Sequence, residues 1–223
     1  MRIAGIDSGK QRDSFAFVGI EIKDNKIYVL GVKTWIQRKY IEVENLIANI
    51  HDSKQFDFYV VEVNNTGEHV YEELKYRHKI PNVIPVFTSA TVKDQSKIAM
   101  GKVMPKNQMV VLMARMFQNN QIRFPNKTNK HIEELKRQIS NFAEHITEAG
   151  NVSYYAEGKE HDDTVMALML AIFVGRHYIR EQEGLKTSIK VESKKYGVTE
   201  KDLLGSGVPT GLETLSTEVY YPN

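Results

Sequence analysis

Short apolar runs separated by polar turns mark the strands in the first half of the chain. The first three runs are joined by turns of a few residues, which predicts antiparallel strands over Arg2–Asp7, Ser14–Ile22 and Lys26–Trp35. A fourth run, Asp57–Val63, is apolar at nearly every position, as expected for a strand buried on both faces. Val83–Phe87 predicts a fifth strand.

Segments with apolar residues at helical spacing lie between and after these strands. They predict helices over Tyr40–His51, Glu68–His78 and Lys106–Asn120, from Thr128 or Asn129 to about Glu144, and from His161-Asp162-Asp163 to about Gln182. Short strands are expected at Ile122–Phe124 and Asn151–Ala156. The order indicates an α/β fold, a mixed sheet of five to eight strands flanked by helices. We expect residues 1–182 to form this domain and residues 183–223 to be a polar, partly irregular extension.

Composition narrows the class of protein. Of the 223 residues, 41% are hydrophobic, which is typical of a soluble globular domain, and the longest apolar run is too short to span a membrane. No signal peptide is visible at the start. The absence of cysteine excludes disulfides, thiolate metal sites and cysteine nucleophiles, and it is compatible with a cytoplasmic location.

The net charge of only +2 means that a surface for nucleic acid needs a local cluster of basic residues. Residues 88–106 are polar and are expected to form an exposed loop or a weak helix. Four lysines of this segment are candidate contacts to DNA phosphates, although a solvated loop would have the same composition: Lys93, Lys97, Lys102 and Lys106.

Acidic residues lie at the ends of three elements that are predicted to be buried. If the first and fourth strands are parallel neighbours, Asp7 and Glu62 lie side by side at one edge of the sheet, and the last helix brings Asp162 or Asp163 to them. Carboxylates that share a site repel one another unless they are protonated or bind cations, and oxygen ligands favour Mg²⁺ or Mn²⁺. Two such ions suit phosphodiester hydrolysis. Alternatively, acids in a first helical turn simply complement the helix dipole, and Asp13 simply begins a strand.

Several motifs, taken in order, resemble the RNase H-like superfamily and, more closely, the nuclease domain of the large terminase subunit of tailed viruses. They are Gly5-Ile6-Asp7-Ser8-Gly9, Asp13-Ser14-Phe15-Ala16, Val61-Glu62-Val63-Asn64-Asn65-Thr66-Gly67, Pro105-Lys106, Ile122-Arg123-Phe124-Pro125 and His161-Asp162-Asp163-Thr164-Val165-Met166-Ala167. The resemblance implies a metal-dependent endonuclease that cuts concatemeric viral DNA during genome packaging in the host cytoplasm. It implies double-stranded DNA, an ATPase motor domain, the small terminase subunit and the portal as partners, and no membrane.

The resemblance also implies roles for individual residues. Two Mg²⁺ or Mn²⁺ ions would be held by Asp7, Glu62 and Asp163, with Asp13 as a further ligand and with Asp162 and His161 as nearby catalytic candidates. The family's ATPase motor is not expected in this chain, because the sequence has no Gly-x-x-x-x-Gly-Lys-Ser/Thr motif.

Other functions fit parts of the pattern. A Holliday-junction resolvase or a transposase would share the superfamily and its acidic residues. The Gly-Ile-Asp-Ser-Gly opening also suits the phosphate-binding hairpin of an actin-like nucleotide-binding domain, but no second glycine-rich phosphate loop is found. A nucleic-acid-binding module without catalysis is disfavoured, because buried carboxylates without metals are destabilising.

Overall fold

The computed structural model describes residues 1–9, 14–64, 66–88, 102–146, 152–156 and 161–176. Residues Met1–Gly175 belong to one compact unit. The expected end of the last helix, residues 177–182, and the polar extension 183–223 lie outside the described residues.

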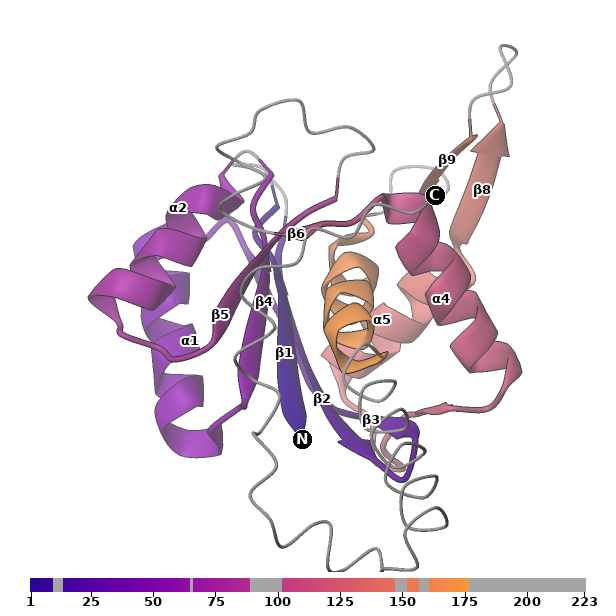
Figure 1. Cartoon of the computed structure of the whole chain (residues 1–223), viewed down its shortest axis with the longest axis horizontal. Helices are drawn as coiled ribbons and strands as arrows, with labels where there is room; N and C mark the ends of the chain where they lie inside the picture. Colours follow the sequence, from indigo (N-terminus) through magenta and orange to yellow (C-terminus); the bar gives the residue numbers. More distant parts are fainter. Residues whose placement is uncertain (10–13, 65, 89–101, 147–151, 157–160, 177–223) are drawn as a thin grey trace, which may run out of the picture. The chain divides into compact units, whose positions relative to one another are not determined.

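The centre of the unit is a seven-stranded mixed sheet (Figure 1). In spatial order its strands are β6 (Lys102–Val103), β5 (Val83–Phe87), β4 (Phe58–Glu62), β1 (Arg2–Asp7), β2 (Ser14–Lys23), β3 (Lys26–Ile36) and β7 (Ile122–Arg123). The first three strands pair antiparallel, whereas β4 is parallel to β1, β5 to β4, β6 to β5 and β7 to β3. The predicted α/β fold with a mixed sheet and an antiparallel opening is confirmed.

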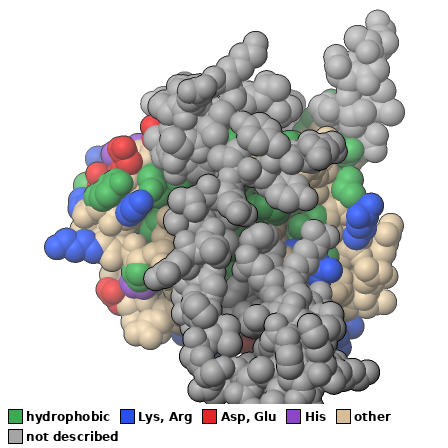
Figure 2. Space-filling model, viewed as in Figure 1, with side chains coloured by type: hydrophobic (Ala, Val, Ile, Leu, Met, Phe, Trp, Pro, Cys, Tyr) green, Lys and Arg blue, Asp and Glu red, His purple; other side chains and the backbone are tan. Residues whose placement is uncertain are grey.

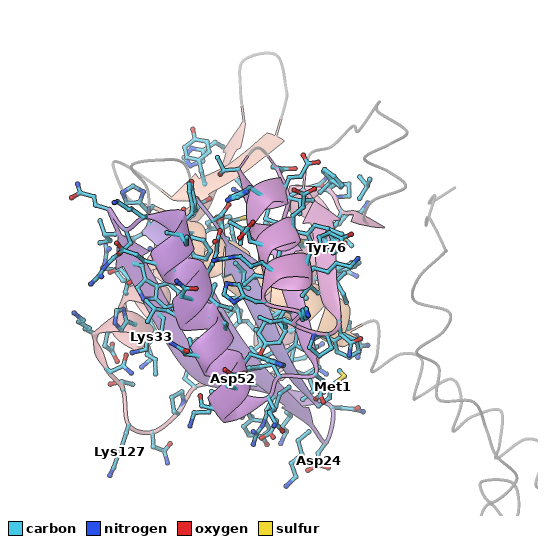
Figure 3. All side chains as sticks on the ribbon, turned by 90° about the vertical axis from the view of Figure 1, so that its left-hand side faces the viewer. Met1, Asp24, Lys33, Asp52, Tyr76 and Lys127 are labelled. Atoms are coloured by element: carbon cyan, nitrogen blue, oxygen red, sulfur yellow. The ribbon has the colours of Figure 1, made fainter. Side chains whose placement is uncertain are left out.

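Alternate residues of each strand face opposite sides of the sheet. On β1, Ala4 and Ile6 belong to a buried cluster with side chains of α1 (Tyr40–Lys54) and of α2 (Gly67–Glu72), which continues as the π-helical turn η1 (Glu73–Arg77). Figure 3 shows α1 and α2 side by side across this face. Gly5 and Asp7 therefore face the other side.

The opposite face is covered by the helix of residues 163–176, with α4 (Lys106–Gln118) and α5 (Lys130–Ser140) on the same side of the sheet (Figure 1). Residues 163–172 are all buried, as the nearly all-apolar sequence predicts. Gly5 permits close packing, since a Cβ on it would lie 1.8 Å from the backbone oxygen of Ala167. The helix backbone thus lies directly against β1.

Two segments differ from the sequence prediction. The helix expected to reach Glu144 ends at Ser140, and residues 142–146 form β8 (Phe142–Ile146), which pairs antiparallel with β9 (Val152–Ala156). Phe142 continues the helical apolar spacing, but pairing with β9 gives the backbone of this segment other hydrogen-bond partners. The short strand β6 lies within the segment that was predicted to be a loop or weak helix. Among the described residues, no helix combines the length and the apolar character needed to cross a bilayer.

Candidate active site

Parallel pairing of β1 and β4 brings the first two acidic residues together. Ile6 lies opposite Val61 in the register, so the next residues, Asp7 and Glu62, are neighbours at the carboxyl ends of the two strands. Tyr59 and Val61 pack in the cluster beneath α1 and α2, so alternation turns Glu62 to the same face as Asp7. This is the face covered by helix 163–176.

The third carboxylate comes from the start of that helix. Asp163 is its first residue, and the Ser14 hydroxyl donates a hydrogen bond of 2.5 Å to Asp163 Oδ2. Ser14 is the first residue of β2. It lies two residues before Ala16, which is paired with Asp7, so Ser14 and Asp7 face the same side of the sheet. Both Asp7 and Asp163 are 7% exposed. Two strand ends and one helix start therefore converge at one edge of the sheet.

Negative charge accumulates at this edge. Burial raises the pKa of Asp7 well above its ordinary value, and the charges of Glu62 and Asp163 raise it further. The backbone N–H of Gly9 donates to Asp7 Oδ1 at 3.1 Å, which acts in the opposite direction. A bound cation would relieve the remaining repulsion.

The donor set suits a hard divalent ion, because the acidic residues offer oxygen atoms alone. Within the described residues, however, no three Asp, Glu or His side chains are close enough to form a complete metal site by themselves. Asp13, the further ligand that the resemblance implies, lies outside the described residues. The carboxylates thus have the chemistry of ligands for a divalent ion, but within the described residues they do not form a metal site by themselves.

Two neutral side chains that sequence reasoning did not single out as functional bind Glu62. The Thr88 hydroxyl donates to Glu62 Oε1, and Asn64 Nδ2 donates to the same oxygen at 3.1 Å and to Thr88 Oγ1 at 2.5 Å. The position of Thr88 in the sequence could have indicated this contact. Thr88 directly follows the predicted strand Val83–Phe87, and a strand–helix–strand order places that strand beside the strand of Glu62.

The residues before Asp163 have different surroundings. Asp162 Oδ2 forms an ion pair with Lys106 Nζ at 2.7 Å. His161 is exposed, and its Nδ1 lies 3.9 Å from Asp163 Oδ2. Gln138 Oε1, on α5, accepts hydrogen bonds from the backbone N–H and the hydroxyl of Thr164, which fixes the start of the helix.

Only one of the four predicted DNA-contacting lysines is described with its side chain. Lys93 and Lys97 lie outside the described residues, and Lys102 lies in β6 with its side chain outside them. Lys106 begins α4 and reaches Asp162 beside the acidic site. On the described surface visible in Figure 2, basic side chains are scattered among acidic and apolar ones.

Comparisons with known proteins agree with the fold. The model of the family described as the terminase RNaseH-like domain matches residues 4–174, which confirms the resemblance seen in the motifs. No curated protein sequence matches the chain.

Solved structures of phage terminases share the fold. The large terminase nuclease of thermophilic phage G20c with bound cobalt is 22% identical, with a TM-score of 0.60 over 77% of this chain and 80% of that one. The nuclease domain of Thermus phage P74-26 is 22% identical, with a TM-score of 0.57 over 77% of each chain. The nuclease domain of bacteriophage SPP1 with bound manganese is 14% identical, with a TM-score of 0.50 over 78% of this chain and 86% of that one.

Proposed function

We propose that this chain, which belongs to the family of terminase RNaseH-like domains, is a divalent-metal-dependent DNA endonuclease that cuts concatemeric viral DNA during genome packaging. The observation that carries the proposal is the convergence of Asp7, Glu62 and Asp163 at one edge of the sheet. The relatives crystallised with cobalt, magnesium or manganese support divalent ions as cofactors. Mg²⁺ and Mn²⁺ are the ions we favour.

In this proposal Asp7, Glu62 and Asp163 would hold two divalent ions through their carboxylate oxygens. The charges of Glu62 and Asp163 both act on Asp7, so Asp7 would serve both ions and the other two residues would serve one ion each. Asp13 is a further ligand in this proposal. When bound, a pair of divalent ions supplies an activated water and neutralises the charge that develops in phosphodiester hydrolysis.

Other side chains prepare the substrate. Lys106 lies beside the site on a fixed element, and its ammonium group would contact a DNA phosphate, while Asp162 holds it in place. The exposed His161 ring lies next to Asp163 and would exchange protons with solvent. Together with Lys93, Lys97 and Lys102, Lys106 would bind the backbone without reading bases.

The wider setting follows from the family. In this proposal residues 1–182 form the nuclease domain and residues 183–223 an extension of it. The nuclease would act on double-stranded DNA in the host cytoplasm, together with an ATPase motor domain, the small terminase subunit and the portal.

The test is cleavage of supercoiled plasmid by purified protein in EDTA, Mg²⁺ or Mn²⁺, with Asp163→Ala beside it. We expect nicked and linear products that need a divalent ion and disappear in the variant. Asp52→Ala, which removes an exposed acid from α1 on the other face of the sheet, is the matched control and should cleave like the wild type. Metal-independent cleavage, or an active Asp163→Ala protein, would overturn the proposal.

A further inference from the structure

Thr88 and Asn64 converge on one oxygen of the Glu62 carboxylate. Both side chains donate to Oε1, and they also bind each other. We propose that Thr88, assisted by Asn64, is a positioning residue that fixes Glu62 through Oε1 and leaves Oε2 for a divalent ion. This inference rests on the proposed function and adds to it a determinant of metal affinity that does not touch the metal.

Each donor group of Thr88 and Asn64 has an acceptor within the cluster. The single hydroxyl proton of Thr88 goes to Glu62, so Thr88 Oγ1 is available to accept from Asn64. The amide of Asn64 has two N–H groups, one for Glu62 and one for Thr88. Every donor therefore points to an acceptor, and the arrangement requires Glu62 Oε1 to be an acceptor, as in a carboxylate.

The backbone around Thr88 is anchored on both sides. In the register of β4 and β5, Glu62 lies opposite Val86, two residues before Thr88. The carbonyl of Thr88 accepts from the N–H of Lys106, the first residue of α4. Thr88 is only 7% exposed. Its hydroxyl is thus held by the sheet and by a helix start, which limits the orientations open to Glu62.

The neutrality of these donors matters for an ion-binding carboxylate. A hydroxyl and an amide orient Glu62 without cancelling its charge, and groups of this kind tune metal ligands elsewhere. The same protein shows the alternative at Glu44, which is 1% exposed and is met by the guanidinium of Arg77 at 3.0 Å. Glu44 is arranged as a structural ion pair, whereas Glu62 is arranged to retain its charge for a cation.

The experiment measures Mn²⁺ binding by calorimetry in the absence of DNA. Thr88→Val removes the hydroxyl at nearly constant shape and should weaken Mn²⁺ binding about 10–100-fold. Thr88→Ser keeps the hydroxyl and should bind within about threefold of the wild type. The matched control is Thr34→Val, which removes a hydroxyl bonded to His131 Nδ1 and should leave the affinity unchanged.

Each outcome decides the inference. The inference is overturned if Thr88→Val binds Mn²⁺ as tightly as the wild type, or if Thr88→Ser loses as much Mn²⁺ affinity as Thr88→Val. In either case, plasmid cleavage by the wild-type protein would still support the proposed function. If circular dichroism shows that Thr88→Val does not fold, Asn64→Ala takes its place and must weaken Mn²⁺ binding. A wild-type protein that neither binds Mn²⁺ nor cleaves DNA would overturn both proposals.

Discussion

Gly5 controls how closely helix 163–176 approaches the sheet, and Gly5→Ala is therefore a sharp test of the site. An added Cβ would lie 1.8 Å from the backbone oxygen of Ala167 and 2.8 Å from its carbonyl carbon. Real Cβ atoms almost never come within 3.0 Å of a heavy atom from another part of the chain, so the strand and the helix must separate by at least 1.2 Å. The obstacle is backbone, so no side-chain rotation relieves it.

This displacement affects stability and activity in different ways. Overpacking of this kind costs about 1–3 kcal/mol of unfolding free energy. Asp163 is the first residue of the displaced helix and must move relative to Asp7 and Glu62. A misplacement of about 1 Å in a catalytic arrangement costs about 100-fold in rate, so cleavage should fall by that order even where the variant is fully folded.

The assay combines urea unfolding with plasmid cleavage, both well below the midpoint of thermal unfolding. Gly31→Ala is the matched control, because a Cβ at Gly31, on β3, meets nothing within 4 Å. That variant should stay within about 0.5 kcal/mol of the wild type and keep its cleavage rate. If Gly5→Ala equals Gly31→Ala in both measurements, the close packing of helix and strand does not set the geometry of the site.

Three further substitutions test the electrostatics and the helix start. Asp7→Asn should lose metal-dependent cleavage and, without metal, should unfold at a higher urea concentration than the wild type. The pKa of Asp7 is raised in the folded state, so the stability of the wild type falls as pH rises through that pKa. The difference in stability between Asp7→Asn and the wild type should therefore be larger at neutral than at acid pH. Arg77→Met should lower the free energy of unfolding in urea by about 1–3 kcal/mol, because Glu44 stays buried without the guanidinium that pairs with it. Burial raises the pKa of Glu44 and favours its protonation, so this loss of stability should be smaller at acid pH. An equal loss at all pH values would contradict this reasoning. Gln138→Leu should lower the free energy of unfolding by about 1–3 kcal/mol, because the backbone N–H and the hydroxyl of Thr164 lose their acceptor. An unchanged free energy of unfolding would show that both donors have another acceptor.

The neighbourhood of Asp7 and Glu62 was predictable because each acid ends a strongly apolar strand. A carboxylate at such a position is costly, and parallel pairing of the two strands puts both at one edge. The choice between Asp162 and Asp163 was not predictable from the sequence. Successive helical residues differ in direction by about 100°, and only the packing of the helix shows that Asp163 meets Ser14 while Asp162 meets Lys106.

The features that sequence reasoning missed depend on contacts between separate segments of the chain. Thr88 stands in a polar stretch where a hydroxyl carries no periodic signal, and its contact with Glu62 follows from the register of β5 against β4. The strand β8 follows an α5 helix whose apolar spacing continues through Phe142, so periodicity alone extended the helix. Pairing with β9 is a tertiary choice that overrides this local pattern.

The spacing of the three carboxylates along the chain has a consequence for protein synthesis. Asp7 and Glu62 are synthesised before Asp163 and can meet once β1 and β4 pair, whereas Asp163 comes about a hundred residues after Glu62 and reaches them only when its helix docks on Gly5. Contacts between such distant segments cost loop-closure entropy before they form, so they form slowly. A nascent chain therefore holds an incomplete acidic cluster until residues 163–176 have left the ribosome, and under the proposed function it would not cleave DNA before then.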